Sequence, residues 1–133
     1  MPPREALGLL VHRRDVGRLG EALAARHVER AGWVIHDRNW RCRHGELDLV
    51  CRDGSTWVFV EVRTLRGSRT GRPEESIRGS KRGAVIRTSL AWLQSHGGIE
   101  QSFRFDVIAV GLDGPEPTIR HIRSAFDGTG EAL

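Results

Sequence analysis

Residues 45–63, GELDLVCRDGSTWVFVEVR, decide the fold, because they form two largely apolar runs around a tight turn. The dipeptide Asp53-Gly54 is a strong hairpin signal, which predicts antiparallel strands over 45–51 and 56–63. Charged residues interrupt both runs: Glu46, Asp48, Glu61 and Arg63. An unpaired buried charge is strongly unfavourable, so these side chains either lie on a solvated face or bind something.

Strand parity predicts which side chains of the hairpin share a face. A loop with an even number of residues places Asp48 and Glu61 on one face, together with Glu46 and Arg63. An odd loop or a bulge would separate them. The other face is expected to hold the apolar side chains of Leu47, Leu49, Val58, Val60 and Val62.

The two carboxylates on this face repel each other unless an opposite charge neutralises them. A hard divalent cation such as Mg²⁺ or Mn²⁺ is one solution, because it prefers carboxylate, carbonyl and water oxygens. Ion pairing with Arg63 on a solvated sheet face is the other. Residue types alone leave both interpretations open.

The rest of the chain predicts a single mixed α/β domain over residues 1–133, with the element order αβββαββ. Residues 1–14 and 127–133 are expected to be peripheral or disordered tails. The further elements expected are a helix over 15–31, a strand over 33–40, a helix from Pro73 or Ser80 to His96 that Gly97-Gly98 ends, and strands over 103–111 and 117–123.

Composition favours a cytoplasmic protein with a polyanionic partner. No apolar run approaches the roughly 20 residues that span a bilayer, and the N-terminus lacks the pattern of a signal peptide. The net charge is +4, and Lys81 is the single lysine among 21 basic residues. The six histidines show no metal-ligand spacing in the sequence, which favours surface and packing roles.

Positive charge gathers directly after the hairpin. Residues 63–87 hold eight basic residues against two acidic ones, which suits contact with a nucleic-acid backbone, although a solvated arginine-rich loop has the same composition. The residues expected to contact nucleic acid are Arg66, Arg69, Arg72, Arg78, Lys81 and Arg82.

Several motifs occur in the order and spacing of a small bacterial family. These are Gly20-Glu21, Asn39, Gly45-Glu46-Leu47-Asp48, Phe59-Val60-Glu61-Val62-Arg63, Lys81, Arg104-Phe105-Asp106-Val107 and Ala125-Phe126. Over residues 15–126 the chain thereby resembles the YraN-like proteins. That family is similar to the restriction-endonuclease-like PD-(D/E)xK nucleases, particularly the archaeal Holliday junction resolvases, which implies an αβββαβ core.

The resemblance also implies a metal site. Asp48, Glu61 and the backbone carbonyl of Val62 would hold Mg²⁺ or Mn²⁺, and Glu21 would complete the site from the first helix. Such an ion would assist hydrolysis of a phosphodiester bond. Glu46 would be an additional ligand or, as the interpretation we favour, a partner for Arg63.

Arg63 departs from the pattern, because it stands where the nuclease motif usually has lysine. Arginine stays protonated and cannot act as a base, although it can stabilise charge in the transition state. Lys81 could supply the missing ammonium group, or be an ordinary solvated residue. The expected function is cleavage of structured or damaged DNA, with a homodimer possible; a non-catalytic nucleic-acid-binding or adaptor protein is the alternative.

Overall fold

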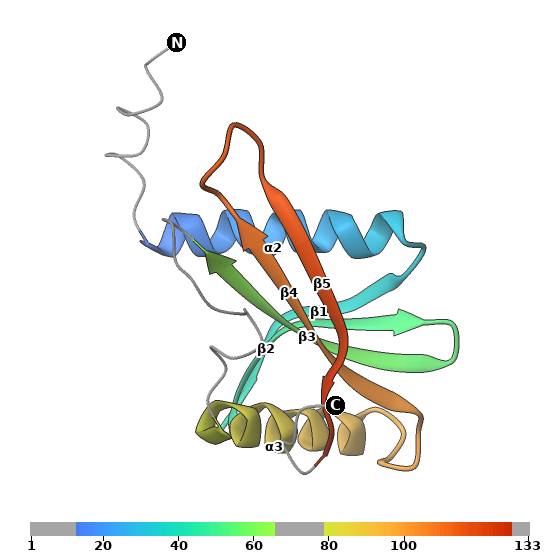
Figure 1. Cartoon of the computed structure of the whole chain (residues 1–133). Coiled ribbons are helices and arrows are strands. Elements are labelled where there is room, and N and C mark those ends of the chain that lie inside the picture. The colour runs from blue at the N-terminus through green and yellow to red at the C-terminus, as the bar shows by residue number, and fades with distance from the viewer. Residues whose placement is uncertain (1–12, 66–78, 129–133) are drawn as a thin grey trace.

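In the computed structural model, residues 13–65 and 79–128 form five strands in one mixed sheet and two helices (Figure 1). In chain order the elements are α2 (Arg13–Arg30), β1 (Val34–Cys42), β2 (Gly45–Asp53), β3 (Thr56–Leu65), α3 (Gly79–Ser95), β4 (Phe103–Gly111) and β5 (Thr118–Phe126). This order confirms the predicted αβββαββ succession. No helix in these ranges is both long and apolar enough to cross a membrane.

The strands lie side by side in the order β1-β2-β3-β4-β5. Neighbouring strands are antiparallel except β3 and β4, which are parallel. A parallel pair needs a crossover connection, and α3 lies within it. The sheet therefore combines a β1–β3 meander with a β4–β5 hairpin.

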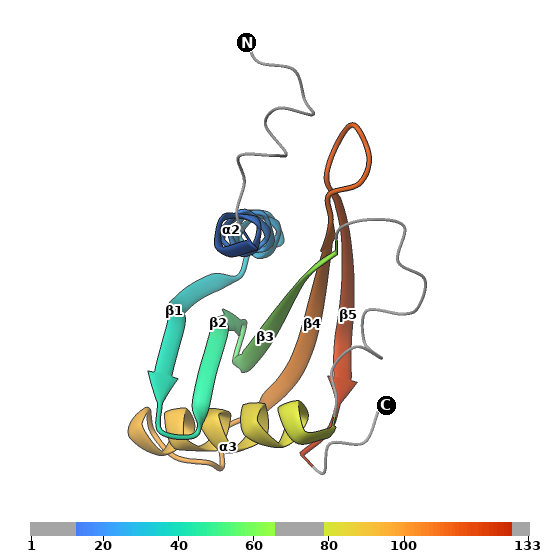
Figure 2. The same cartoon turned by 90° about the vertical axis from the view of Figure 1, so that its left-hand side faces the viewer.

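Each helix covers one face of the sheet, so the protein has two hydrophobic cores (Figure 2). On the α2 face, Ala24 and Val28 pack against β2, β3 and β4. On the α3 face, Trp92 and Leu93 pack against the other side of these strands. Because β3 and β4 are buried on both faces, their sequences are nearly continuous apolar runs rather than alternating ones.

The element ends differ from the expected ones by a few residues. α2 begins at Arg13, so residues 13 and 14 belong to the helix and not to a tail. The hairpin turn consists of Gly54 and Ser55, because Asp53 still pairs with Thr56. As predicted, Gly97 and Gly98 end α3: both have positive φ, and Gly98 N donates to Leu93 O at 2.8 Å.

Gly20 sets how closely α2 approaches β3. A Cβ atom at this buried position would collide with Thr64 Oγ1 and lie 3.1 Å from Thr64 Cβ. A glycine here therefore lets the helix lie directly on the sheet. The same close approach sets how near the next residue, Glu21, lies to the sheet.

Gly20→Ala is expected to lower the free energy of unfolding by about 1–3 kcal/mol, the usual cost of overpacking a filled interior. Gly17→Ala is the matched control on the same helix, because nothing lies within 4 Å of a Cβ there. That change should instead stabilise by about 0.5–1 kcal/mol through helix propensity. Urea unfolding of both variants measures the difference, and equal effects would contradict the close contact with Thr64.

Candidate active site

The β1–β2 hairpin bends where Asn39 lies opposite Asp48. Asn39 has a φ of 52°, in the left-handed region that asparagine tolerates better than most residues. Regular pairs flank this point, with Arg38 opposite Leu49 and Trp40 opposite Leu47. The left-handed residue interrupts the pleat without changing the register.

This bend moves side chains from one face of the sheet to the other. Leu49 packs in the α2-side core with Val60, whereas Leu47 packs in the α3-side core with Phe59. The prediction that Leu47 and Leu49 share a face is therefore wrong, because strict alternation holds only along an unbroken strand. The predicted pairing parity of β2 and β3 is confirmed, since Leu49 lies opposite Val60.

Asp48 occupies the point where β2 separates from β3. The last regular pair of the two strands is Leu49 with Val60. Beyond it, Val62 N donates a 2.8 Å hydrogen bond to Asp48 Oδ2, so the carboxylate replaces a strand partner. This bond fixes the Asp48 side chain beside the backbone of residue 62.

Glu61 is the most buried carboxylate of the hairpin, with 3% of the residue exposed. It lies next to Lys81 at the start of α3, whose Nζ is 3.5 Å from Glu61 Oε2. The positive charge of Arg63 also acts on Glu61. The single lysine of the chain therefore enters the acidic region from the helix that follows the hairpin.

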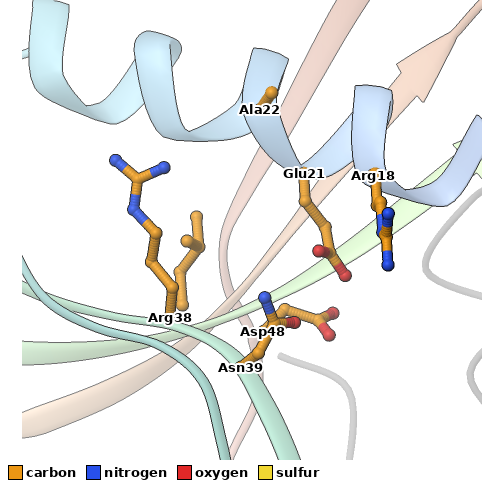
Figure 3. A pocket seen from close by; sticks show the side chains of 7 residues that line it. Arg18, Glu21, Ala22, Arg38, Asn39 and Asp48 are labelled. Atoms are coloured by element: carbon orange, nitrogen blue, oxygen red, sulfur yellow. The ribbon is translucent and has the colours of Figure 1, made fainter. Parts of the chain in front are cut away.

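A pocket of about 290 Å³ opens between α2 and the bend of the hairpin. Figure 3 shows Glu21 pointing from the helix toward Asp48 and Asn39. With its amide nitrogen turned toward the carboxylates, Asn39 donates to Glu46 Oε1 at 2.9 Å and to Glu21 Oε2 at 3.3 Å. Asn39 thus links the acid from the helix to one from the hairpin.

Asp48 and Glu61 hold their protons unusually well. Burial raises the pKa of Asp48 to about 6, and the negative charge of Glu21 acts in the same direction. Burial and the charge of Asp48 raise the pKa of Glu61 to about 8, although Lys81 opposes the shift. The two acids repel each other in a poorly solvated place, so an added positive charge would be strongly favoured there.

Most of the residues proposed from the sequence lie in this region. Glu21, Asp48, Glu61 and Lys81 interact with one another through the contacts and charges described above. Glu46 also acts on Asp48 through its charge, and the arginine that donates to its Oε2, at 3.0 Å, is Arg41 Nε rather than the expected Arg63.

The proposed nucleic-acid contacts are only partly within the described residues. Arg66, Arg69, Arg72 and Arg78 lie outside them. Arg82 belongs to α3 and its guanidinium carbon lies 5.6 Å from the centroid of the Phe126 ring. Binding of nucleic acid by this basic stretch therefore remains a prediction.

Two arginines of the pocket were missed in the sequence. Arg18 lies one helical turn before Glu21, and this spacing was the available signal. Arg38 lines the pocket from β1 and pairs with Glu29 of α2 at 3.9 Å. The direction of the Arg38 side chain depends on irregularities of β1, and the alternation of residues along the sequence does not reveal them.

Comparison with known proteins identifies the family. The sequence model described as "Uncharacterised protein family UPF0102" matches residues 20–110. A UPF0102 protein of Anaeromyxobacter dehalogenans is 48% identical over 118 residues, which cover 89% of this chain and 88% of the relative. A UPF0102 protein of Rhodococcus jostii is 43% identical over 88% of this chain and 100% of its own length. This chain therefore belongs to the UPF0102 family.

Proposed function

We propose that this protein is a metal-dependent nuclease that hydrolyses phosphodiester bonds in structured or damaged DNA. One observation carries the proposal: Asp48 and Glu61 bring two poorly solvated carboxylates together, and both have raised pKa values. A divalent cation would offset both charges at once. The αβββαβ part of the element order is also the one expected of a restriction-endonuclease-like PD-(D/E)xK core.

The donor set suits Mg²⁺ or Mn²⁺. Asp48 and Glu61 offer hard carboxylate oxygens, and the backbone of Val62 is held beside Asp48 and can add its carbonyl. Glu21 faces Asp48 across the pocket and can bind directly or through water. When bound, the ion would lower the pKa of a water ligand and offset charge on the phosphate.

Two cationic side chains beside Glu61 have different roles in this proposal. Lys81 lies at the carboxylate and can hold or release a proton near the attacking water. Arg63 stays charged and stabilises the negative charge that grows on the phosphate. Lys81 would thus replace the lysine that the nuclease motif usually has at the position of Arg63.

DNA would approach over the pocket between α2 and the hairpin. Arg18 and Arg38 line this pocket and can contact phosphates on either side of the cleaved bond. Binding through phosphates would weaken steeply with salt. On a four-way junction we expect two copies to act, since resolution requires paired cuts.

A second candidate is a DNA-binding or adaptor protein that does not cleave. Arg63 favours it, because an arginine at the motif's lysine position cannot deprotonate water. In this case the acidic pocket would bind metal or remain protonated, and Lys81 would only neutralise Glu61.

A cleavage assay distinguishes the two candidates. Purified protein is incubated with branched, flapped, single-stranded and duplex DNA and with RNA, each with Mg²⁺, Mn²⁺ or EDTA. We expect metal-dependent cuts on a branched or flapped substrate. Asp48→Asn should slow them by about 100-fold or more, since even the partners of metal ligands contribute 10–100-fold.

Matched variants make the assay specific. Glu100→Gln removes one acidic charge at the exposed α3–β4 connection and should leave cleavage unchanged. Lys81→Arg keeps the positive charge near Glu61 but removes a transferable proton, so cleavage should fall if lysine takes part. Absence of metal-dependent cleavage on every substrate would sink the nuclease proposal, and cleavage that persists in Asp48→Asn would place the chemistry elsewhere.

A further inference from the structure

A bulge in β1 brings two polar side chains to the same face of the sheet. The register of β1 and β2 shifts between Ile35 and Asp37, so His36 is the additional residue. Such a bulge turns two successive side chains toward one side. The His36 ring lies 5.3 Å from that of Trp92, and Trp92 Nε1 donates to Asp37 Oδ2 at 2.7 Å. Both residues therefore face α3.

The end of α3 adds a second imidazole to this place. His96 stacks on Trp92 with ring centroids 3.9 Å apart, and its ring lies 5.4 Å from that of His36. His96 Nδ1 is 2.7 Å from Trp92 O and 2.9 Å from Ser95 Oγ. Donation from Nδ1 to the carbonyl leaves the lone pair on Nε2, the tautomer found in metal-binding histidines.

His36 is arranged differently. Its Nδ1 lies 3.0 Å from Asp37 Oδ2, so a nitrogen and a carboxylate oxygen already stand side by side, and an ion held by both would replace the proton between them. Trp92 donates to the same oxygen, which holds the Asp37 side chain in position. Hydrogen bonds of this kind orient ligands around metal ions in proteins.

We propose that His36, Asp37 and His96 bind a transition-metal ion such as Zn²⁺, Co²⁺ or Ni²⁺, independently of the acidic pair. One ligand atom from each residue lies within 4.8 Å of the other two. Ligand atoms about 2.0–2.1 Å from a tetrahedral zinc are about 3.4 Å apart, so the side chains need to close by less than about 1.5 Å. The exposed side chain of His36 can make this movement.

The ligand types determine which ion fits. Two imidazoles and one carboxylate favour zinc and its neighbours over Mg²⁺, which prefers oxygen ligands alone. Three protein ligands would leave a position for water, as in zinc sites that act on substrates. The histidine spacing in the sequence gave no indication of this site, because a bulge and a distant helix end create it.

Metal titration of the tag-free protein tests this proposal. The protein carries Asp48→Asn and Glu61→Gln, which disable the acidic pair, and Co²⁺ or Zn²⁺ is added in a calorimeter. We expect one equivalent to bind, and Co²⁺ should show an absorption band and quench part of the tryptophan fluorescence, since Trp92 lies against the site. His36→Gln and His96→Gln should each weaken binding about tenfold or more.

His44→Gln is the matched control, since His44 lies at the β1–β2 turn and outside the cluster. It should bind as tightly as its parent. Circular dichroism establishes whether each variant is folded. If His96→Gln unfolds, His36→Gln still tests the proposal, because the exposed His36 can be replaced without disturbing the core. The proposal is overturned if neither ion binds the protein that lacks the acidic pair, or if binding survives His36→Gln.

Discussion

Asp106→Ala is expected to lower the free energy of unfolding by about 3–5 kcal/mol, because it leaves buried partners without their acceptor. The Asp106 side chain is fully buried. It accepts hydrogen bonds from His121 Nε2 at 2.8 Å, Ser124 N at 3.0 Å and Arg104 Nε at 3.0 Å. Ser124 has a φ of 49°, so the carboxylate also holds an unusual turn of the β5 backbone.

The pH dependence of this contribution follows from the Asp106 pKa. Burial raises the pKa, but hydrogen bonds from His121, Ser124 and Arg104 outweigh it and hold the pKa below its ordinary value. The contribution is therefore complete above the ordinary pKa and is lost as pH falls through the lowered one. Urea unfolding at a series of pH values should show a large difference between variant and wild type at about pH 7 that shrinks as pH falls below 3.8, the ordinary pKa.

Asp53→Asn is the control, because Asp53 shares the partner Arg104 but lies near the surface. Its Oδ2 is 3.3 Å from Arg104 Nη1, and 35% of its side chain is exposed. Exposed ion pairs contribute about 0–1 kcal/mol, so this variant should be close to wild type. If Asp53→Asn loses as much stability as Asp106→Ala, the buried hydrogen bonds of Asp106 do not contribute the expected amount of about 3–5 kcal/mol.

The fold was predictable from sequence where the strands are regular. β4 was predicted with its observed bounds, since an apolar run between a glycine pair and a turn has few alternatives. β1 and β5 were less well predicted because backbone irregularities shape them. Asn39 and Ser124 have positive φ, and tertiary contacts rather than local propensity determine such conformations.

The acidic residues of the site were predictable for a similar reason. Carboxylates in an apolar hairpin are conspicuous, and pairing parity depends only on an even loop. The direction of Asp48 was not predictable, because it depends on the left-handed Asn39 that bends the hairpin. That bend turns Leu47 into the α3-side core and leaves Asp48 beside Glu21. Residue types therefore identified the acids but not the shape of the pocket.

Glu61→Gln is expected to stabilise the metal-free protein by an amount on the order of a few kcal/mol above neutral pH. Burial and the charge of Asp48 raise the pKa of Glu61 from 4.5 to about 8. Lys81 and Arg63 oppose this shift, and Glu21 acts on the pair through Asp48. The folded state thus binds the proton more tightly than the unfolded state.

The sign of the pH effect follows from this difference. The favourable contribution of the protonated group is complete below pH 4.5 and is lost as pH rises through about 8, so wild type in EDTA should lose stability over this range. Glu61→Gln should flatten the loss, since the amide cannot ionise. A change of 1 kcal/mol moves the melting temperature by about 4 °C in a domain of this size, which is readily measured.

Added Mn²⁺ connects this stability to the proposed site. An ion that binds only the folded state raises the melting temperature, so Mn²⁺ should restore the stability that wild type loses at high pH and have little effect on Glu61→Gln. Glu29→Gln removes the same charge from an exposed position on α2 and should behave as wild type. A wild-type stability that does not change between pH 5 and pH 9 in EDTA would mean that the folded protein already neutralises both carboxylates. The main physical reason for a metal at this site would then be lost.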